Sequence, residues 1–307
     1  MANLKTQVAL AFAAVYLIWG STYLAIRFVI ESLPPFFMAG TRFMIAGAIL
    51  YLLMRLRGAQ TPSRDQWGKA ALVGGLMLLG GNGAVVWAEQ YLPSGLTSII
   101  VATVPLWIAL LSWLSTRNKP NRAIVAGLIL GFVGVGLLVG DIGTLGESQV
   151  AFLGGIALVF GTLLWASGSL YSRTAKLPSS SLLATAMEMV TGGILLFTAS
   201  FVTGEWTQIR LDQVSLRSGF SWLYLIVFGS LIGYTSYMWL LKNVNPERVS
   251  TYAYVNPVVA LFLGWALASE TLSIQDIVAA LVILTSVAVI TTYGAAHKTP
   301  EEAKDKG

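Results

Sequence analysis

Long apolar runs alternate with short polar breaks along the whole chain. A membrane-spanning helix needs about 20 mostly apolar residues, and the chain offers ten such runs. The breaks hold prolines, glycines or charged residues, as at Leu33-Pro34-Pro35 and Asn245-Pro246, and such residues end helices. The pattern therefore predicts an all-α integral membrane protein with ten transmembrane helices. Their approximate bounds are 6–29, 34–54, 69–88, 94–114, 122–140, 150–173, 179–203, 218–241, 249–268 and 274–294.

The composition agrees with a chain solvated by lipid. Of the 307 residues, 56% are apolar and 11% are charged, whereas a soluble domain has about 45 to 50% and about 25%. The absence of Cys excludes disulfides, thiolate zinc sites and catalytic cysteines. The single His, His297, falls in the polar C-terminal tail, and the sequence has no metalloprotease motif and no P-loop. We therefore expect neither an enzyme nor a cofactor or metal site.

The basic residues indicate the orientation. The net charge is +5, and 15 of the 19 Lys and Arg fall on one side when the spans alternate and the N-terminus is placed in the cytoplasm. Cytoplasmic loops are enriched in Lys and Arg, so both termini are predicted to be cytoplasmic. The basic charge then reflects topology and not a nucleic-acid site. The four residues that fall elsewhere are Arg27, Arg42, Arg210 and Arg217.

The two halves of the chain match each other. The offset is about 146 residues in the first spans of each half and about 152 farther along. Each half holds five predicted spans, and because five is odd, the second half is inverted in the membrane relative to the first. We place the first five-helix repeat at 1–142, the second at 143–294 and a polar cytoplasmic tail at 295–307. Matched pairs are Trp19 with Trp165, Ser21 with Ser167, Arg27 with Arg173, Gly81 with Gly233, Ser98 with Ser250 and Pro105 with Pro257.

Four stretches carry a family resemblance. They are I-W-G-S-T-Y at 18–23, G-T-R-F-M-I-A-G at 40–47, P-S-G-L-T-S-I-I-V-A-T-V-P-L at 93–106 and S-T-Y-A-Y-V-N-P-V-V-A at 250–260. With these stretches the chain resembles the drug/metabolite transporter superfamily with two EamA-type domains, in its YedA-like inner-membrane branch, over about residues 8–293. The resemblance implies a ten-helix exporter of small organic molecules in the cell (inner) membrane, with a central cavity between the halves.

Two charges fall inside predicted spans, Arg42 in the second and Glu188 in the seventh, and they match at the 146-residue offset. A charge at the centre of a membrane helix costs about 2.5 to 3.5 kcal/mol on insertion scales, so each is a functional candidate. Arg42 has a structural alternative, in which it braces neighbouring helices. For Glu188 we keep open a proton site, contact with a cationic group of the substrate, and an ion pair with Arg42.

Aromatic and polar side chains recur at helical spacing inside the spans, so that one helix face differs from a lipid-facing one. They are predicted either to face a substrate pathway or to pack against a neighbouring helix. The pathway candidates are Trp19, Tyr23, Asn82, Trp165, Glu188, Tyr234, Tyr237, Tyr252 and Asn256.

Pro105 and Pro257 fall inside the fourth and ninth predicted spans, at matching positions of the two halves. A proline in a helix interior removes a hydrogen bond and kinks the helix. Interrupted helices at corresponding positions indicate the binding region of a repeat transporter. A static kink is the alternative reading.

These features favour a secondary transporter that works by alternating access. A membrane enzyme acting on lipid, and a receptor, scaffold or channel, are the alternatives. The expected partners are the lipid bilayer and a small-molecule substrate, with protons as a candidate coupling ion and the chain acting as a monomer. Amino acids or amphiphilic drugs would suit the aromatic, weakly charged spans. The sequence leaves the substrate, the coupling ion and the strict direction of transport open.

Overall fold

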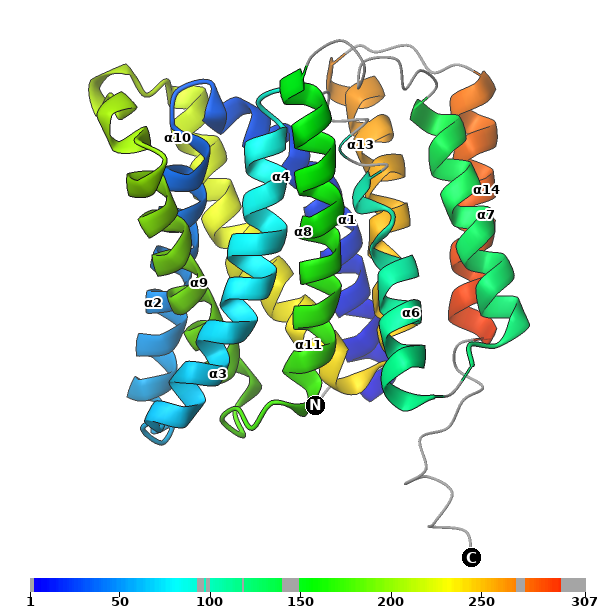
Figure 1. Ribbon diagram of the computed structural model, residues 1–307, viewed down its shortest axis with the longest axis horizontal. Helices are drawn as coiled ribbons and strands as arrows, with labels where there is room; N and C mark the ends of the chain where they lie inside the picture. The colour runs from blue at the N-terminus through cyan, green and yellow to red at the C-terminus, as the bar shows by residue number, and fades with distance from the viewer. Residues whose placement is uncertain are drawn as a thin grey trace, which may run out of the picture.

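The computed structural model describes residues 3–92, 97, 100–117, 119–139, 149–268 and 274–293. In these ranges the regular elements are all helical, and the helices run side by side as a bundle (Figure 1). The predicted tail with His297, Ser98 of the repeat match and the whole predicted break at 141–147 lie outside the described residues.

The helices follow the predicted apolar runs. In the first half they are α1 (Leu4–Ile30), α2 (Pro35–Leu56), α3 (Arg64–Gly74), η1 (Gly75–Asn82), α4 (Gly83–Ala88), α6 (Val104–Thr116) and α7 (Arg122–Val139). In the second half they are α8 (Gln149–Thr174), α9 (Ser181–Val202), η3 (Glu205–Gln208), η4 (Leu211–Gln213), α10 (Leu216–Tyr224), η5 (Leu225–Tyr234), α11 (Thr235–Asn243), α12 (Pro246–Val249), α13 (Tyr252–Ala268) and α14 (Ile274–Tyr293).

Six helical segments are long and apolar enough to cross a membrane, judged by length and composition over the described residues. Shorter apolar helices accompany them at Val104–Thr116, Arg122–Gly134 and Ile277–Tyr293. The prediction of an all-helical, multi-pass membrane protein is therefore confirmed, and the number of ten spans stays a prediction. The six segments are Leu4–Ile30, Pro35–Leu56, Arg64–Ala88, Phe152–Thr174, Ser181–Val202 and Leu216–Asn243.

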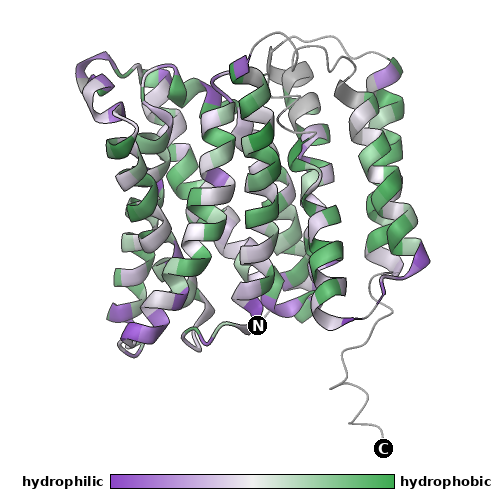
Figure 2. Cartoon of the chain, in the orientation of Figure 1, coloured by the Kyte–Doolittle hydropathy of each residue, from purple (hydrophilic) through white to green (hydrophobic). Residues whose placement is uncertain are grey.

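The outer surface of the bundle suits a hydrocarbon solvent. Large apolar side chains such as Leu17, Phe160 and Leu281 are each 61% exposed. Hydrophilic residues gather toward the two ends of the helices, with apolar residues between them (Figure 2). Because exposed apolar surface is unfavourable in water, this distribution places the middle of the bundle in the bilayer.

The bundle has two ends, which we name from Figure 1. The lower end carries the N-terminus and the loop between α2 and α3, and the upper end carries the loop between α9 and α10. The α2–α3 loop contains Gln60, and the α9–α10 loop contains Gln208; both side chains are exposed. These two residues are suitable reporters of orientation.

If the N-terminus is cytoplasmic, a Cys at Gln60 is expected to resist an impermeant maleimide in intact cells, because the lower end then faces the cytoplasm. A Cys at Gln208 should react rapidly, and the native chain contributes no thiol of its own. Labelling of Gln60→Cys after the cells are permeabilised is the control. Rapid labelling at Gln60 in intact cells would reverse the orientation.

Pro105 requires a correction to the sequence prediction. We expected it inside a continuous fourth span, but α6 begins at Val104 and Pro105 stands in its first turn, after a turn at residues 102–103. Proline is tolerated in the first turn because the backbone N–H there has no partner within the helix. Pro105 therefore begins a helix and does not kink the interior of one.

Two long helical segments contain a π-helical stretch. These are η1 (Gly75–Asn82) and η5 (Leu225–Tyr234). At an offset of 152 residues, positions 75–82 correspond to 227–234, so the two stretches fall at matching places. The π-helix is rare and often occurs at functional sites. We did not expect either stretch from the sequence.

Helices α2 and α9 approach each other at two glycines. A Cβ atom on Gly47 would lie 2.7 Å from the backbone nitrogen of Val190, and one on Gly193 would lie 2.6 Å from that of Met44. Positions 44 and 47 match 190 and 193 at the 146-residue offset. The two contacts are therefore counterparts of each other, and both depend on the absence of a side chain.

A carboxylate from the second half caps α2. The backbone N–H groups of Phe36 and Phe37 donate to Glu205 at 3.2 and 2.9 Å, although α2 has no capping side chain of its own at Pro34. A negative group at a helix N-terminus is stabilising. Burial raises the pKa of Glu205, and the hydrogen bonds from Phe37 and Phe36 lower it by less, so that the pKa is raised overall.

This raised pKa makes the stability of the protein depend on pH. A carboxyl that binds its proton more tightly in the folded state favours folding at low pH, and that contribution is lost as the pH rises through the raised pKa. As the pH rises above the ordinary carboxyl value of about 4, the wild type is therefore expected to lose stability relative to Glu205→Gln. Thermal unfolding of both proteins above that value measures the difference. A wild type that gains on the variant with rising pH would contradict the assignment.

Candidate central cavity

A cavity lies between the two halves, with about 710 Å3 of empty space when the solvent at its opening is included. Its walls come from α1, α2, η1, α4 and α6 in the first half and from α8, η5 and α13 in the second. Seven of the nine pathway candidates line it, whereas Tyr237 and Glu188 do not. The seven are Trp19, Tyr23, Asn82, Trp165, Tyr234, Tyr252 and Asn256.

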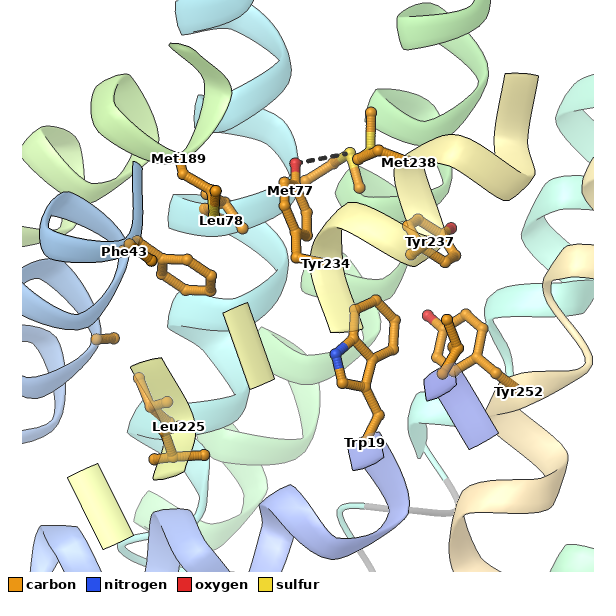
Figure 3. Packing of buried hydrophobic residues seen from close by; sticks show 14 of the residues in the cluster. Trp19, Phe43, Met77, Leu78, Met189, Leu225, Tyr234, Tyr237, Met238 and Tyr252 are labelled. Carbon is orange, nitrogen blue, oxygen red and sulfur yellow. Dashed lines mark hydrogen bonds between the residues drawn. The ribbon is translucent and has the colours of Figure 1, made fainter. Parts of the chain in front are cut away.

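One wall of the cavity is a cluster of rings. The aromatic cluster comprises Trp19, Trp165, Tyr234, Tyr237 and Tyr252, all of which except Tyr237 line the cavity, and Figure 3 shows Trp19 with the three tyrosines. The Trp19 ring centroid lies 5.7 Å from that of Trp165 and 5.0 Å from that of Tyr252, both in edge-on contact. Such geometry favours aromatic pairs. The two tryptophans matched in the sequence are therefore in direct contact.

Hydrogen bonds fix these rings. The Trp165 indole N–H donates to the Tyr237 hydroxyl at 3.1 Å, and Ser169 lies 2.8 Å from the same hydroxyl. Trp19 donates its indole N–H to the carbonyl of Gly229, inside the π stretch η5, at 3.1 Å. Tyr237 thus supports the cavity wall from behind.

The matched glycines of the π stretches make room for the two tryptophans. A Cβ on Gly81 would lie 2.7 Å from the Trp165 ring, and one on Gly233 would lie 2.5 Å from the Trp19 indole nitrogen. These contacts are again counterparts in the two halves. Each π stretch therefore supports the tryptophan of the other half through a glycine.

Polar groups without partners reach the cavity. Arg42 is 4% exposed and donates through Nε to Ser230 at 2.9 Å, with its guanidinium 4.3 Å from the centre of the Phe43 ring. Its Nη1, the Asn82 Oδ1 and the Asn256 Oδ1 are buried, and none has a hydrogen-bond partner among the described residues. Such groups are costly to leave unpaired, so the cavity offers one donor and two acceptors to a polar ligand.

Glu188 lies away from the cavity. It is fully buried in α9, and both of its carboxylate oxygens lack a hydrogen-bond partner among the described residues. Its electrostatic partners are Lys242 and the Tyr234 side chain. The salt bridges of the described chain are Lys69–Asp65 and Arg217–Glu31, so Glu188 and Arg42 do not form the ion pair considered from the sequence.

Glu89 belongs to this region, although the sequence analysis did not select it as a site residue. It follows α4, and both carboxylate oxygens are buried without a partner among the described residues. Arg27 and Arg42 attract it. Glu89 stands at the end of an apolar run, where a charge is ordinarily read as a boundary. Its signal was its position seven residues after Asn82, which is about two turns of an α-helix and therefore on the same helix face.

Pro257 lies inside α13, as predicted. It follows Asn256 of the cavity wall, and proline has no N–H for the carbonyl of Ala253, four residues earlier. The helix is therefore weakened beside the cavity. Whether it serves as a gate stays a prediction.

Comparison with known proteins identifies the family. The model of the EamA-like transporter family matches residues 6–140 and again residues 152–292. The chain belongs to this family. The EamA-like family places it among membrane transporters and not among enzymes.

Individual EamA-like relatives agree. The chain is 40% identical to the "uncharacterized inner membrane transporter YedA" of Escherichia coli strain K12, over 92% of this chain and 89% of that protein. It is 25% identical to the "uncharacterized transporter YoaV" of Bacillus subtilis strain 168, over 90% and 94%. A solved crystal structure at 20% identity has a TM-score of 0.73 and covers 94% of this chain and 97% of that one. This last likeness concerns the fold alone.

Proposed function

We propose that this EamA-like protein is a secondary transporter of the inner membrane that exports small organic metabolites, such as amino acids or amphiphilic drugs, by alternating access around the central cavity. The observation that carries the proposal is the construction of the cavity from both halves, with Trp19 and Trp165 in contact at its wall.

The inverted repeat is supported by reciprocal contacts. Beyond the glycine contacts of α2 with α9 and of the π stretches with the tryptophans, a third set occurs between α7 and α14. A Cβ on Gly131 would lie 2.6 Å from Ser286 Oγ, and one on Gly134 would lie 2.8 Å from Ile283. At the 152-residue offset, Gly131 corresponds to Ile283 and Gly134 to Ser286. Each of the two contacts is therefore the counterpart of the other. Reciprocal contacts of this kind arise when two similar halves face each other about a two-fold axis.

That symmetry supports alternating access as the proposed mechanism. If the halves are similar but inverted, each can adopt the conformation of the other, and the cavity then opens at the opposite end. The π stretches and the helix break before Pro105 lie beside the cavity, where a change of helix geometry would change its shape. Pro257 is proposed to act at the same place in the second half.

The lining suits a small amphiphile. Rings from Trp19, Trp165, Tyr234 and Tyr252 offer apolar and stacking surface, while Arg42 and the two Asn oxygens offer polar contacts. A mostly apolar pocket with a few oriented polar groups is typical of small-molecule sites.

Counterflow in proteoliposomes tests the proposal. A thermal-shift screen against amino acids and amphiphilic cations first selects a ligand, because binding to the folded state raises its stability. Liposomes loaded with unlabelled ligand should then take up labelled ligand transiently above equilibrium, and empty liposomes are the control. Only a carrier with alternating access gives this exchange. Uptake without acceleration would favour a channel, and no uptake of any stabilising ligand would favour a receptor.

A further inference from the structure

The wall of the central cavity carries a positive charge that no acid of the wall balances. Among the described residues that line the cavity, Arg42 is the charged side chain, and no Asp, Glu or Lys accompanies it. The contacts of its guanidinium are neutral, because Nε donates to the Ser230 hydroxyl at 2.9 Å and the Phe43 ring centre lies 4.3 Å away. Arg42 takes no part in the salt bridges of the described chain.

Glu89 does not supply the missing contact. It attracts Arg42 at longer range, but Arg27 is its stronger electrostatic partner, and Glu89 is not among the residues that line the cavity. Nη1 of Arg42 is buried and has no hydrogen-bond partner among the described residues. A guanidinium has five N–H donors, and a charge at membrane depth persists when it is paired or faces water. The cavity therefore leaves a position for an anion at Arg42.

This position adjoins the aromatic cluster. Two consecutive residues of η5 hold the charge and a ring side by side, since the Gly229 carbonyl accepts from the Trp19 indole at 3.1 Å and Ser230 accepts from Arg42. A Cβ on Gly229 would lie 3.8 Å from Nη2 of Arg42. An anionic group on the guanidinium would therefore have the rings of the cluster within reach of the rest of the same molecule.

We infer that the cavity binds an organic carboxylate with an aromatic or other apolar body, the carboxylate on Arg42 and the body against the aromatic cluster. A carboxylate can accept two N–H groups in the fork geometry of a guanidinium, and such charge-assisted hydrogen bonds are the strong ones. A cationic ligand would instead meet a like charge, which is costly in a site that excludes water. The inference rests on the proposed function and narrows it, because amphiphilic cations no longer fit.

A matched ligand series tests the inference on the unmodified protein. The probes 3-phenylpropionate, 3-phenylpropionamide and 3-phenylpropylamine share a ring and a carbon chain, and their terminal groups are negative, neutral and positive at pH 7. The same three groups on an indolyl and on a linear alkyl body extend the series. Calorimetric titration in detergent should give the carboxylate a dissociation constant about tenfold or more below those of its amide and amine, in at least one body.

Substitutions of Arg42 assign the preference to this side chain. Arg42→Gln removes the charge and should reduce the preference for carboxylate over amide to less than about twofold. Arg42→Lys keeps the charge without the fork, so the preference should remain while the affinity falls. Arg210→Gln makes the same change at an exposed side chain and should leave the whole series unaltered. Melting temperatures check the fold of each variant, and if Arg42→Gln fails to fold, Arg42→Lys and the wild-type series decide.

The outcomes separate the inference from the proposed function. Equal binding of the three terminal groups, tighter binding of the amine or no binding of any carboxylate overturns the inference, and so does a preference that survives Arg42→Gln. Counterflow of another ligand would then leave the proposed transport in place. A carboxylate preference that is lost in Arg42→Gln, without counterflow of that carboxylate or of any other ligand, would retain the anion site and remove the transport proposal.

Discussion

Replacement of Glu188 by Gln is expected to flatten the pH dependence of transport while ligand binding is retained. Glu188 is fully buried, and neither carboxylate oxygen has a hydrogen-bond partner among the described residues. A carboxyl in such a place persists when it is neutral, paired or opened to water during the cycle. An amide imitates the protonated acid and cannot release the proton. Where one proton limits the rate, wild-type transport should change by about tenfold per pH unit, and the variant by less than about twofold.

Counterflow and ligand-induced thermal shift, measured across pH for both proteins, test this expectation. If Glu188 instead serves only as the partner of Lys242, the variant should lose stability and keep its pH profile. The loss should then be non-additive with Lys242→Gln in a double-mutant cycle. A Glu188→Gln protein with unchanged rate, pH profile and melting temperature would exclude both roles.

The helices could be predicted from the sequence because a span has a simple physical requirement. The first two apolar runs predicted spans at 6–29 and 34–54, and α1 and α2 cover Leu4–Ile30 and Pro35–Leu56. Pro34-Pro35 marks the second boundary, since proline suits a first turn and cannot continue a helix. Apolar length and helix-ending residues are local properties, and a single sequence contains them.

The cavity could be predicted only in part. Midspan Trp and Asn are poorly suited to lipid, and this singled out Trp19, Trp165 and Asn256, all of which line the cavity. The π stretches escaped prediction because their apolar pattern differs little from that of an α-helix. Glu188 was selected by depth alone, yet depth does not say whether a residue faces the cavity or a neighbouring helix.

The crossing of α2 and α9 is expected to fail when Gly193 is replaced by Val. A Cβ at this position would lie 2.6 Å from the backbone nitrogen of Met44 and 3.0 Å from the carbonyl oxygen of Gly40. Backbone atoms cannot turn aside as a flexible side chain can, so the helices must separate. Overpacking costs about 1 to 3 kcal/mol and occasionally more. A contact this short should lower the free energy of unfolding by about 3 kcal/mol. Melting temperature and monodispersity in detergent measure the loss.

Gly136→Val is the matched control, because it makes the same substitution in a helix where the new Cβ has no neighbour within 4 Å beyond the adjoining backbone of its own helix. Both variants change helix propensity equally, so their difference isolates the crossing. Gly47→Val, at the counterpart position against Val190, should lose as much stability as Gly193→Val if the two halves share the contact. Wild-type melting of Gly193→Val would mean that α2 and α9 separate at little cost, and the close crossing would then not hold the two halves together.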